Sequence, residues 1–152
     1  MGTDEPQRLG WDSWAMAIAG AVSLRGDCTR RQVGAVIIGE RHEIISIGYN
    51  GVAPGEPGCL QGACPRGKLT MEEQPAGGSY ANCIATHAEM NALIRADHER
   101  LAGATMYVTC EPCSECAKVA ANTPLSQIVY ADNGQLVKTF SDIQEWTRRE
   151  RR

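Results

Sequence analysis

Three residues of the chain have the side chains and the spacing of a zinc site. His87 offers an imidazole, and Cys113 and Cys116 offer two thiols within a Pro-Cys-x-x-Cys motif. A catalytic zinc site typically takes three protein ligands and leaves a fourth position to water. Glu89 follows the histidine by two residues and is placed to carry protons beside such a water. We therefore predict a hydrolytic zinc centre, with a purely structural Cys/His zinc site or a chance match to the motif as the alternatives.

The spacing of these residues indicates which elements must position them. Cys113 and Cys116 are three apart, so they share one face of a helix, and Pro112 before them suits a first helical turn. His87 and Glu89 would point apart in the middle of a helix, so they converge only if the helix begins there. We therefore place both motifs at helix N-termini, where the helix dipole favours thiolates and bound hydroxide.

The periodicity of apolar residues predicts the remaining elements. Helical spacing from Trp11 predicts a helix that ends by Gly26, and the apolar run 33–38 predicts a strand covered on both faces. A hairpin turn over 39–43 and a returning strand over 44–49 follow. The later predicted elements are the His87 helix ending around 97–100, a strand over 105–109, the Cys113 helix ending before Pro124, a strand over 128–131 and a helix over 142–149.

This order of elements predicts an α/β fold with three α/β/α layers and a mixed sheet of four or five strands. With 152 residues, we expect a flexible N-terminus over 1–10 and one domain over 11–152. The sequence has no signal-peptide pattern and no apolar run of membrane-spanning length, so we expect a cytoplasmic protein without membrane association. A net charge of −3 argues against a broad nucleic-acid surface.

Residues 50–79 form a Gly- and Pro-rich stretch that is too long for an ordinary connection. The stretch has few apolar residues to pack, so it needs another reason to be ordered. Four cysteines remain outside the catalytic pair and Cys110, and four thiolates complete a closed tetrahedral site. We predict that they hold a second, structural zinc: Cys28, Cys59, Cys64 and Cys83. Four reduced, unligated cysteines, or a disulfide between two of them, are the alternative.

The two metal motifs together match the H-x-E and P-C-x-x-C signature of zinc deaminases. With residues 28–36, the Gly-Tyr-Asn-Gly stretch 48–51 and residues 106–109, the chain resembles the deoxycytidylate (dCMP) deaminases of bacteria and bacteriophages, within the cytidine deaminase-like superfamily. The metal motifs define only the superfamily. The 48–51 stretch and the extra cysteines narrow the resemblance to the dCMP branch.

This resemblance implies zinc-dependent hydrolysis of dCMP to dUMP and ammonia, with Glu89 passing a proton to N3 of cytosine. It also implies that the backbone N–H of Ala88 lies near the base O2 and that Asn50 contacts base or sugar. Regulated members bind Mg²⁺ with an allosteric nucleotide, at a site where they usually have proline and this chain has Ala53. We expect a homo-oligomer, from dimer to hexamer.

Arg30 and Arg31 directly precede the first predicted strand. A pair of guanidinium groups suits the 5′-phosphate of a nucleotide, since arginine makes bidentate phosphate contacts. Two solvated arginines in a loop are the alternative. Three other functions stay open: deamination of a modified cytosine nucleotide or nucleoside, editing of tRNA or single-stranded DNA, and a non-catalytic zinc module. The last of these would leave Glu89 unexplained.

Overall fold

The computed structural model of the chain describes residues 5–139. The predicted helix over 142–149 lies outside these residues, as do the first four residues of the predicted flexible N-terminus. The helices and strands are α1 (Trp11–Ser23), β1 (Gly34–Ile38), β2 (Ile44–Tyr49), α2 (Ala88–Arg95), β3 (Thr105–Val108), α3 (Ser114–Ala121), β4 (Gln127–Asp132) and β5 (Gln135–Lys138).

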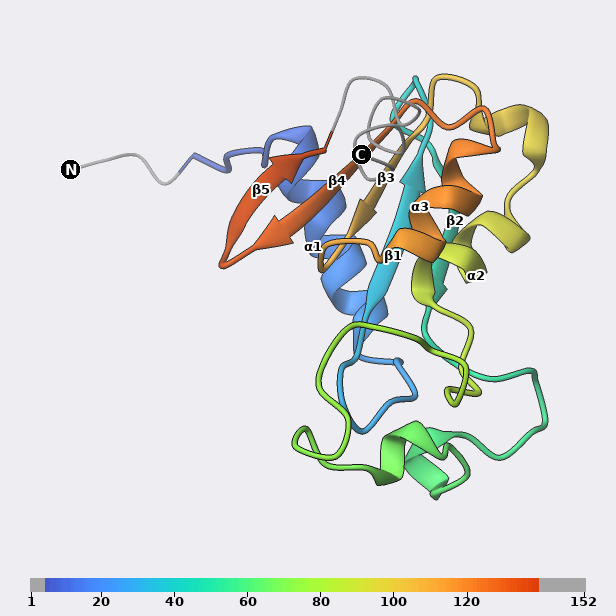
Figure 1. Ribbon diagram of the computed structural model, residues 1–152. Coiled ribbons are helices and arrows are strands. Elements are labelled where there is room, and N and C mark those ends of the chain that lie inside the picture. The colour runs from blue at the N-terminus through green and yellow to red at the C-terminus, as the bar shows by residue number, and fades with distance from the viewer. Residues whose placement is uncertain (1–4, 140–152) are drawn as a thin grey trace.

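The strands form one mixed sheet in the order β2-β1-β3-β4-β5 (Figure 1). β1 pairs antiparallel with β2 and with β3, and β3 pairs parallel with β4. The chain therefore crosses from β2 to β3 through α2 and from β3 to β4 through α3. β5 returns antiparallel beside β4. The mixed sheet that the order of elements predicted is confirmed, with five strands.

Helices cover both faces of this sheet (Figure 1). On one face, Ala15 and Ala19 of α1 pack among buried residues of β1, β3 and β4. On the other face, α2 and α3 bury Ala92 and Ala120 in a second cluster with Ile37 of β1. Every residue of β1 is buried, as the continuous apolar run predicted. The three-layer α/β/α arrangement is confirmed.

Two glycines let the helices approach the sheet closely. A Cβ at Gly48 would lie 2.3 Å from the carbonyl oxygen of Ala88 and 2.3 Å from the nitrogen of Ala92. A Cβ at Gly34 would lie 2.1 Å from the carbonyl oxygen of Ala19. Atoms that are not bonded to each other do not come this close, so neither position has room for a side chain. The approach at Gly48 fixes the first turn of α2 against β2.

The segments 24–33 and 50–86 gather beyond one end of the sheet (Figure 1). We name this part of the molecule the lower lobe. It has no strand pairing beyond one bridge between Gly51 and Thr86, and its short 3-10 turns are Cys59–Gln61 and Arg66–Lys68. Residues 50–79 of the lobe are the long connection that the sequence predicted.

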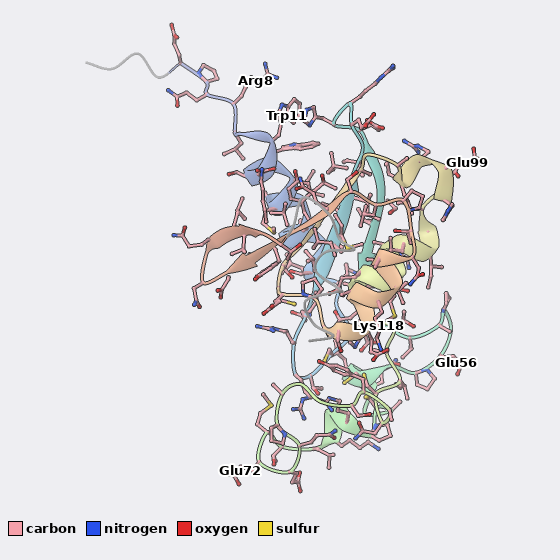
Figure 2. The ribbon with its side chains drawn as sticks, turned by 45° about the horizontal axis from the view of Figure 1, so that its top comes forward. Arg8, Trp11, Glu56, Glu72, Glu99 and Lys118 are labelled. Carbon is pink, nitrogen blue, oxygen red and sulfur yellow. The ribbon has the colours of Figure 1, made fainter. Side chains whose placement is uncertain are left out.

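The other end of the molecule is formed by the start of α1 and the β1–β2 turn. Figure 2 shows Trp11 there, far from Glu72 of the lower lobe. The Trp11 ring stacks on His42 with centroids 3.8 Å apart, and the Tyr107 hydroxyl donates to Asp12 at 2.7 Å. His42 is exposed, and so is His98. Among the helices of residues 5–139, none has the length and apolar character needed to cross a membrane.

Two details differ from the sequence predictions. α2 ends at Arg95, and the residues after it form a separate 3-10 turn, His98–Leu101, whose N-cap Asp97 accepts the N–H of Glu99. The strand β5 was not located by its sequence pattern, because only two of its four residues are apolar. The turn before it is Asn133-Gly134, with φ of 48° and 80°, and this Asn-Gly dipeptide is the signal that would have predicted a hairpin.

Candidate active site

The structure brings together the three predicted metal ligands. The ligand atoms of His87, Cys113 and Cys116 all lie within 4.8 Å of one another. Nδ1 of His87 is 3.5 Å from Sγ of Cys113 and 3.4 Å from Sγ of Cys116. A tetrahedral zinc with ordinary bond lengths places its nitrogen and sulfur ligands about 3.5 Å apart. The three donor atoms therefore fit one zinc ion in both chemistry and spacing.

Helix starts position these ligands, as the spacing argument predicted. His87 is the N-cap of α2, with φ −66° and ψ 155°, and Cys113 is the N-cap of α3, with φ −73° and ψ 166°. Neither side chain makes a capping hydrogen bond to its own helix. They turn toward each other instead, and Cys116 comes in from the first turn of α3. Two helix N-termini thus converge on the site, which favours negatively charged ligands.

The hydrogen bond between the two thiols shifts their pKa values in opposite directions. The hydrogen bond from Cys116, followed by the one with His87, lowers the pKa of Cys113 to about 4 despite its partial burial. The same hydrogen bond with Cys113, together with burial, raises the pKa of Cys116. The hydrogen bond to Cys113 also raises the pKa of His87. A thiolate is therefore already favoured at Cys113, and thiolate is the form that binds zinc.

The Glu89 carboxyl lies in the first turn of α2 and is only 3% exposed. Burial raises its pKa above the ordinary value, although its own backbone N–H and the nearby His87 act in the opposite direction. The ion pairs among residues 5–139 do not include it. A buried carboxyl with a raised pKa suits a group that takes up and returns protons near neutral pH.

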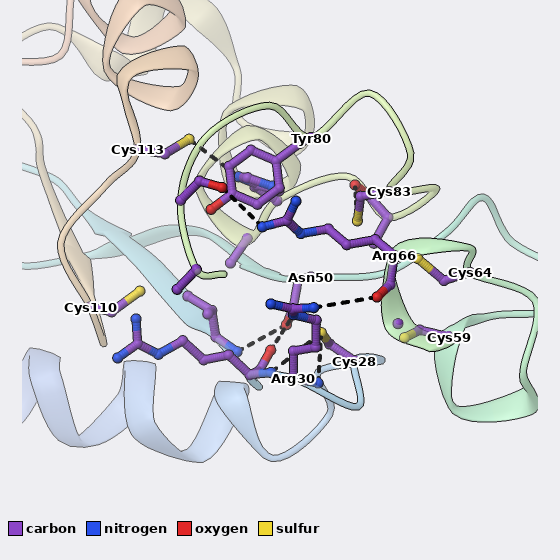
Figure 3. Close-up of a pocket in the computed structure, with 18 of the residues that line it drawn as sticks. Cys28, Arg30, Asn50, Cys59, Cys64, Arg66, Tyr80, Cys83, Cys110 and Cys113 are labelled. Carbon is purple, nitrogen blue, oxygen red and sulfur yellow. Dashed lines mark hydrogen bonds between the residues drawn. The ribbon is translucent and has the colours of Figure 1, made fainter. Parts of the chain in front are cut away.

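A pocket of about 420 Å³ connects the metal ligands with the lower lobe (Figure 3). His87, Glu89 and Cys113 line one part of it. The lining also includes the four cysteines of the predicted second zinc site and three arginines: Cys28, Cys59, Cys64, Cys83, Arg30, Arg31 and Arg66. Ligand pockets of small molecules typically measure about 300–1,000 Å³, so the cavity has the size for a mononucleotide.

Asn50 and Ala88, the two residues predicted to contact the base or sugar, both line this pocket. Asn50 is 7% exposed. Its Oδ1 accepts the N–H of Val33 at 2.9 Å, and its Nδ2 donates to the carbonyl of Arg31 at 2.8 Å. Asn50 thus also holds the backbone that leads into β1. Ala88 is the first residue of α2, and the N–H groups of a first turn have no partner within the helix.

The two arginines predicted to bind phosphate have different surroundings. Arg30 directs its guanidinium into the lower lobe, where it donates to the carbonyls of Arg66 at 3.5 Å and Leu69 at 3.4 Å, and to that of Gln74. Arg31 has an exposed side chain at the pocket. Arg30 therefore supports the lobe, and Arg31 is the one of the pair that is available to a ligand.

The four cysteines of the predicted second site lie around the same pocket but are less tightly grouped. Within residues 5–139, His87, Cys113 and Cys116 are the only group of three or more candidate ligands whose atoms lie within 4.8 Å of one another. The sulfur of Cys28 accepts the N–H groups of Arg30 and Arg31, both at 3.3 Å.

Backbone N–H groups also reach the sulfur atoms of Cys59 and Cys64. Cys59 accepts the N–H of Thr29 at 3.3 Å. At Cys64, burial acts to raise the pKa, but N–H groups of Ile84, Gly67 and Arg66 outweigh it and the pKa is lowered. Burial raises the pKa of Cys83, which is hydrogen-bonded to Cys64. Such N–H contacts stabilise thiolates.

Three residues of the pocket were not assigned a role at the site from the sequence. Arg66 is 4% exposed, and the ring of Tyr80 lies 4.5 Å from that of His87. Nothing in their sequence context marks them beyond proximity to the motif cysteines. Cys110 also lines the pocket, where burial raises the pKa of its thiol to about 11. It is not part of the group formed by His87, Cys113 and Cys116.

Comparisons with known proteins find similar chains. The family described as "Cytidine and deoxycytidylate deaminase zinc-binding region" matches residues 9–132. The deoxycytidylate deaminase of Mycobacterium phage D29 is 40% identical over 126 residues, which cover 81% of this chain and 95% of that protein. The deoxycytidylate deaminase of Schizosaccharomyces pombe is 33% identical over 124 residues, covering 81% of this chain and 37% of that protein.

A solved structure has the same fold. The dCMP deaminase of cyanophage S-TIM5, in complex with dCMP and dUMP, matches with a TM-score of 0.61 and 20% identity, covering 90% of this chain and 89% of that one.

Proposed function

Because the chain belongs to the cytidine and deoxycytidylate deaminase zinc-binding family, we propose that it hydrolyses dCMP to dUMP and ammonia. The observation that carries this proposal is the buried carboxyl of Glu89 beside a His/Cys/Cys zinc ligand set, in a pocket of nucleotide size. A purely structural zinc site would not need a buried proton carrier such as the Glu89 carboxyl, whose pKa is raised.

His87, Cys113 and Cys116 would hold the zinc, which when bound supplies a water that is acidified toward neutral pH. Glu89 accepts a proton from the attacking water, donates it to N3 of cytosine, and then assists the departure of ammonia from C4. The N–H of Ala88 is assigned to the base O2. The second N–H of the Asn50 side-chain amide is assigned to the sugar or base. The hydrogen bonds of that amide with Val33 and Arg31 hold the chain that leads into β1.

We assign the 5′-phosphate to Arg31, since Arg30 is committed to carbonyls of the lower lobe. Replacing Arg31 by Gln should lower kcat/KM for dCMP about tenfold or more, because a charge-assisted contact is worth about 1.5–3 kcal/mol. The efficiency on deoxycytidine should stay the same. A native protein equally efficient on both substrates would overturn the assignment.

We also propose a second, structural zinc held by Cys28, Cys59, Cys64 and Cys83. Its support is the backbone N–H groups directed at three of the four sulfur atoms, together with their position around one pocket. Metal analysis should find near two zinc ions per chain, and near one after the double change Cys59→Ser with Cys64→Ser. A native content of one that the double variant leaves unchanged would exclude the second zinc.

The substrate itself is tested by a panel assayed for ammonia release: dCMP, dCTP, cytidine, deoxycytidine, 5-methyl-dCMP and a tRNA anticodon stem. We expect dCMP to react fastest. Preference for 5-methyl-dCMP would indicate a modified cytosine substrate, and reaction of the tRNA stem alone would indicate an editing enzyme. If the zinc-loaded protein releases ammonia from no compound of the panel, the result would favour a non-catalytic zinc module.

Three further properties stay predictions. A homo-oligomer of two to six chains is tested by light scattering of the purified protein. Regulation by a nucleotide with Mg²⁺ is tested by adding dCTP or dTTP with and without Mg²⁺ to the dCMP assay. The cytoplasmic location is tested by fractionation of the cells that produce the protein.

A further inference from the structure

Tyr80 links the metal ligand His87 to a buried cation. The rings of Tyr80 and His87 meet edge to face, with centroids 4.5 Å apart and planes at 88°. The guanidinium carbon of Arg66 lies 4.6 Å from the centre of the Tyr80 ring. In Figure 3, Arg66 extends from the side of the pocket that holds Cys64 and Cys83 toward Tyr80. Tyr80 therefore contacts a metal ligand and a fixed positive charge at once.

Arg66 is held in place by the backbone around Tyr80. Its guanidinium donates to the carbonyls of Ser79 at 2.9 Å, Gly77 at 3.0 Å and Pro75 at 3.3 Å. The ion pairs of residues 5–139 do not include Arg66, although it is 4% exposed. A buried charge is costly unless it is hydrogen-bonded. Here the three carbonyl dipoles and the Tyr80 ring stabilise the positive charge of Arg66 in place of a carboxylate. The turn and the arginine therefore stabilise each other.

Little else fixes the turn before Tyr80. Residues 75–79 are all exposed, so core packing does not hold them in place. Gly77 and Gly78 have φ of 84° and 72°, a conformation that suits glycine and directs the neighbouring carbonyls toward Arg66. Without the guanidinium, three carbonyls would lose their partner and Tyr80 would lose the support of its turn.

The His87 imidazole needs an orienting partner. Histidines that bind metals are usually fixed by a second group at the nitrogen that does not face the metal. Within residues 5–139, the hydrogen bonds of the His87 ring are those between Nδ1 and the two thiols. The edge-to-face contact with Tyr80 is a further specific contact of the ring, and such aromatic pairs contribute about 0.5–1.5 kcal/mol.

From these contacts we propose that Arg66 and Tyr80 are positioning residues of the metal centre. Arg66 fixes the 75–79 turn, the turn fixes Tyr80, and Tyr80 holds the His87 ring with Nδ1 toward the thiols. The inference rests on metal binding by His87, Cys113 and Cys116, but not on the identity of the substrate.

The test follows the release of zinc from the zinc-loaded protein to a coloured chelator, without substrate. The phase of release that Cys116→Ser lacks reports this metal centre. Tyr80→Leu and Arg66→Met should speed this phase about tenfold, the lower end of the range for groups that orient metal ligands. Tyr80→Phe keeps the ring and should stay within twofold of the native rate. Arg66→Lys keeps the positive charge but lacks the planar guanidinium group, so its rate of zinc release should lie between those of the native protein and Arg66→Met.

Two measurements separate positioning from a merely structural role. Arg100→Met, a change of an exposed arginine, should leave the release rate unchanged. Limited proteolysis should cut the 69–79 segment faster in Arg66→Met but not in Tyr80→Phe. Faster proteolysis of Arg66→Met with a native rate of zinc release would overturn the role of Arg66, and a native rate in Tyr80→Leu would overturn the proposal as a whole. If Arg66→Met does not fold, the rates of zinc release from Arg66→Lys and Tyr80→Leu still test the proposal.

Discussion

Replacement of Gly48 by Ala is the sharpest test of how the sheet positions the catalytic groups. The new Cβ would lie 2.3 Å from two backbone atoms of α2, the carbonyl oxygen of Ala88 and the nitrogen of Ala92. Ordinary contacts of a methyl carbon begin near 3.4 Å. Because both atoms belong to the helix backbone, no side-chain rotation relieves the contact, and α2 must move away from β2 by about 1 Å.

This shift has two consequences of calculable size. Overpacking of this kind costs about 1–3 kcal/mol of unfolding free energy, reduced by the gain of about 0.5–1 kcal/mol from replacing glycine in a strand. We expect a net loss of up to about 2.5 kcal/mol. The same shift displaces His87, Ala88 and Glu89 together, and a misplacement of about 1 Å can lower the rate up to 10²-fold. Turnover should therefore fall more than stability alone would explain.

The assay combines urea unfolding, followed by tryptophan fluorescence, with kcat at saturating dCMP. Gly20→Ala is the matched control, since Gly20 lies within α1 and a Cβ there meets nothing within 4 Å. It should gain about 0.5–1 kcal/mol of stability and keep the native kcat. Gly48→Ala with native stability and with kcat within twofold of native would show that the contact between α2 and β2 does not set the position of the site.

Three further predictions concern single side chains. Glu89→Ala should keep its zinc and lose about 10²–10⁴-fold in turnover; retention of more than a tenth of the native rate would point to another acid. Burial raises the pKa of Cys110 to about 11, so its alkylation by iodoacetamide, followed by peptide mass spectrometry, should be slow at mildly alkaline pH and rise only as the pH approaches that value. Alkylation as fast as that of a free cysteine would contradict this. Tyr107→Phe removes the bond to Asp12 and should cost about 1.5 kcal/mol in urea unfolding, whereas an unchanged midpoint would show that the bond contributes no net stability.

The sequence predicted the parts of the fold and site that depend on local patterns. The apolar run 33–38 predicted a strand covered on both faces, and β1 is buried throughout. The two-residue spacing of His87 and Glu89 predicted a helix start, and His87 is the N-cap of α2. Both features follow from backbone periodicity and the chemistry of nearby residues, and tertiary contacts did not override them.

The parts of the fold and of the site that the sequence did not predict depend on contacts between distant segments. β5 has only two apolar residues, and its hairpin depends on pairing with β4, although the Asn133-Gly134 turn carried a usable signal. The role of Arg66 could not be read from the sequence, because its partners are backbone carbonyls of residues 75, 77 and 79. Carbonyl groups are present at every position, so only the turn geometry selects these three.

The pocket residues come from two different parts of the molecule, and this difference predicts whether a substitution affects mainly kcat or mainly KM. Glu89 and the metal ligands come from α2 and α3, which pack on the sheet, so their positions depend on core contacts such as the one at Gly48. Arg31 belongs to the lower lobe, which is held by guanidinium–carbonyl bonds. Changes in the core should therefore act mainly on kcat, because they move the reacting groups against each other. Changes at Arg31 should act mainly on KM and on the preference for a phosphorylated substrate, because phosphate binding contributes about equally before and during the reaction.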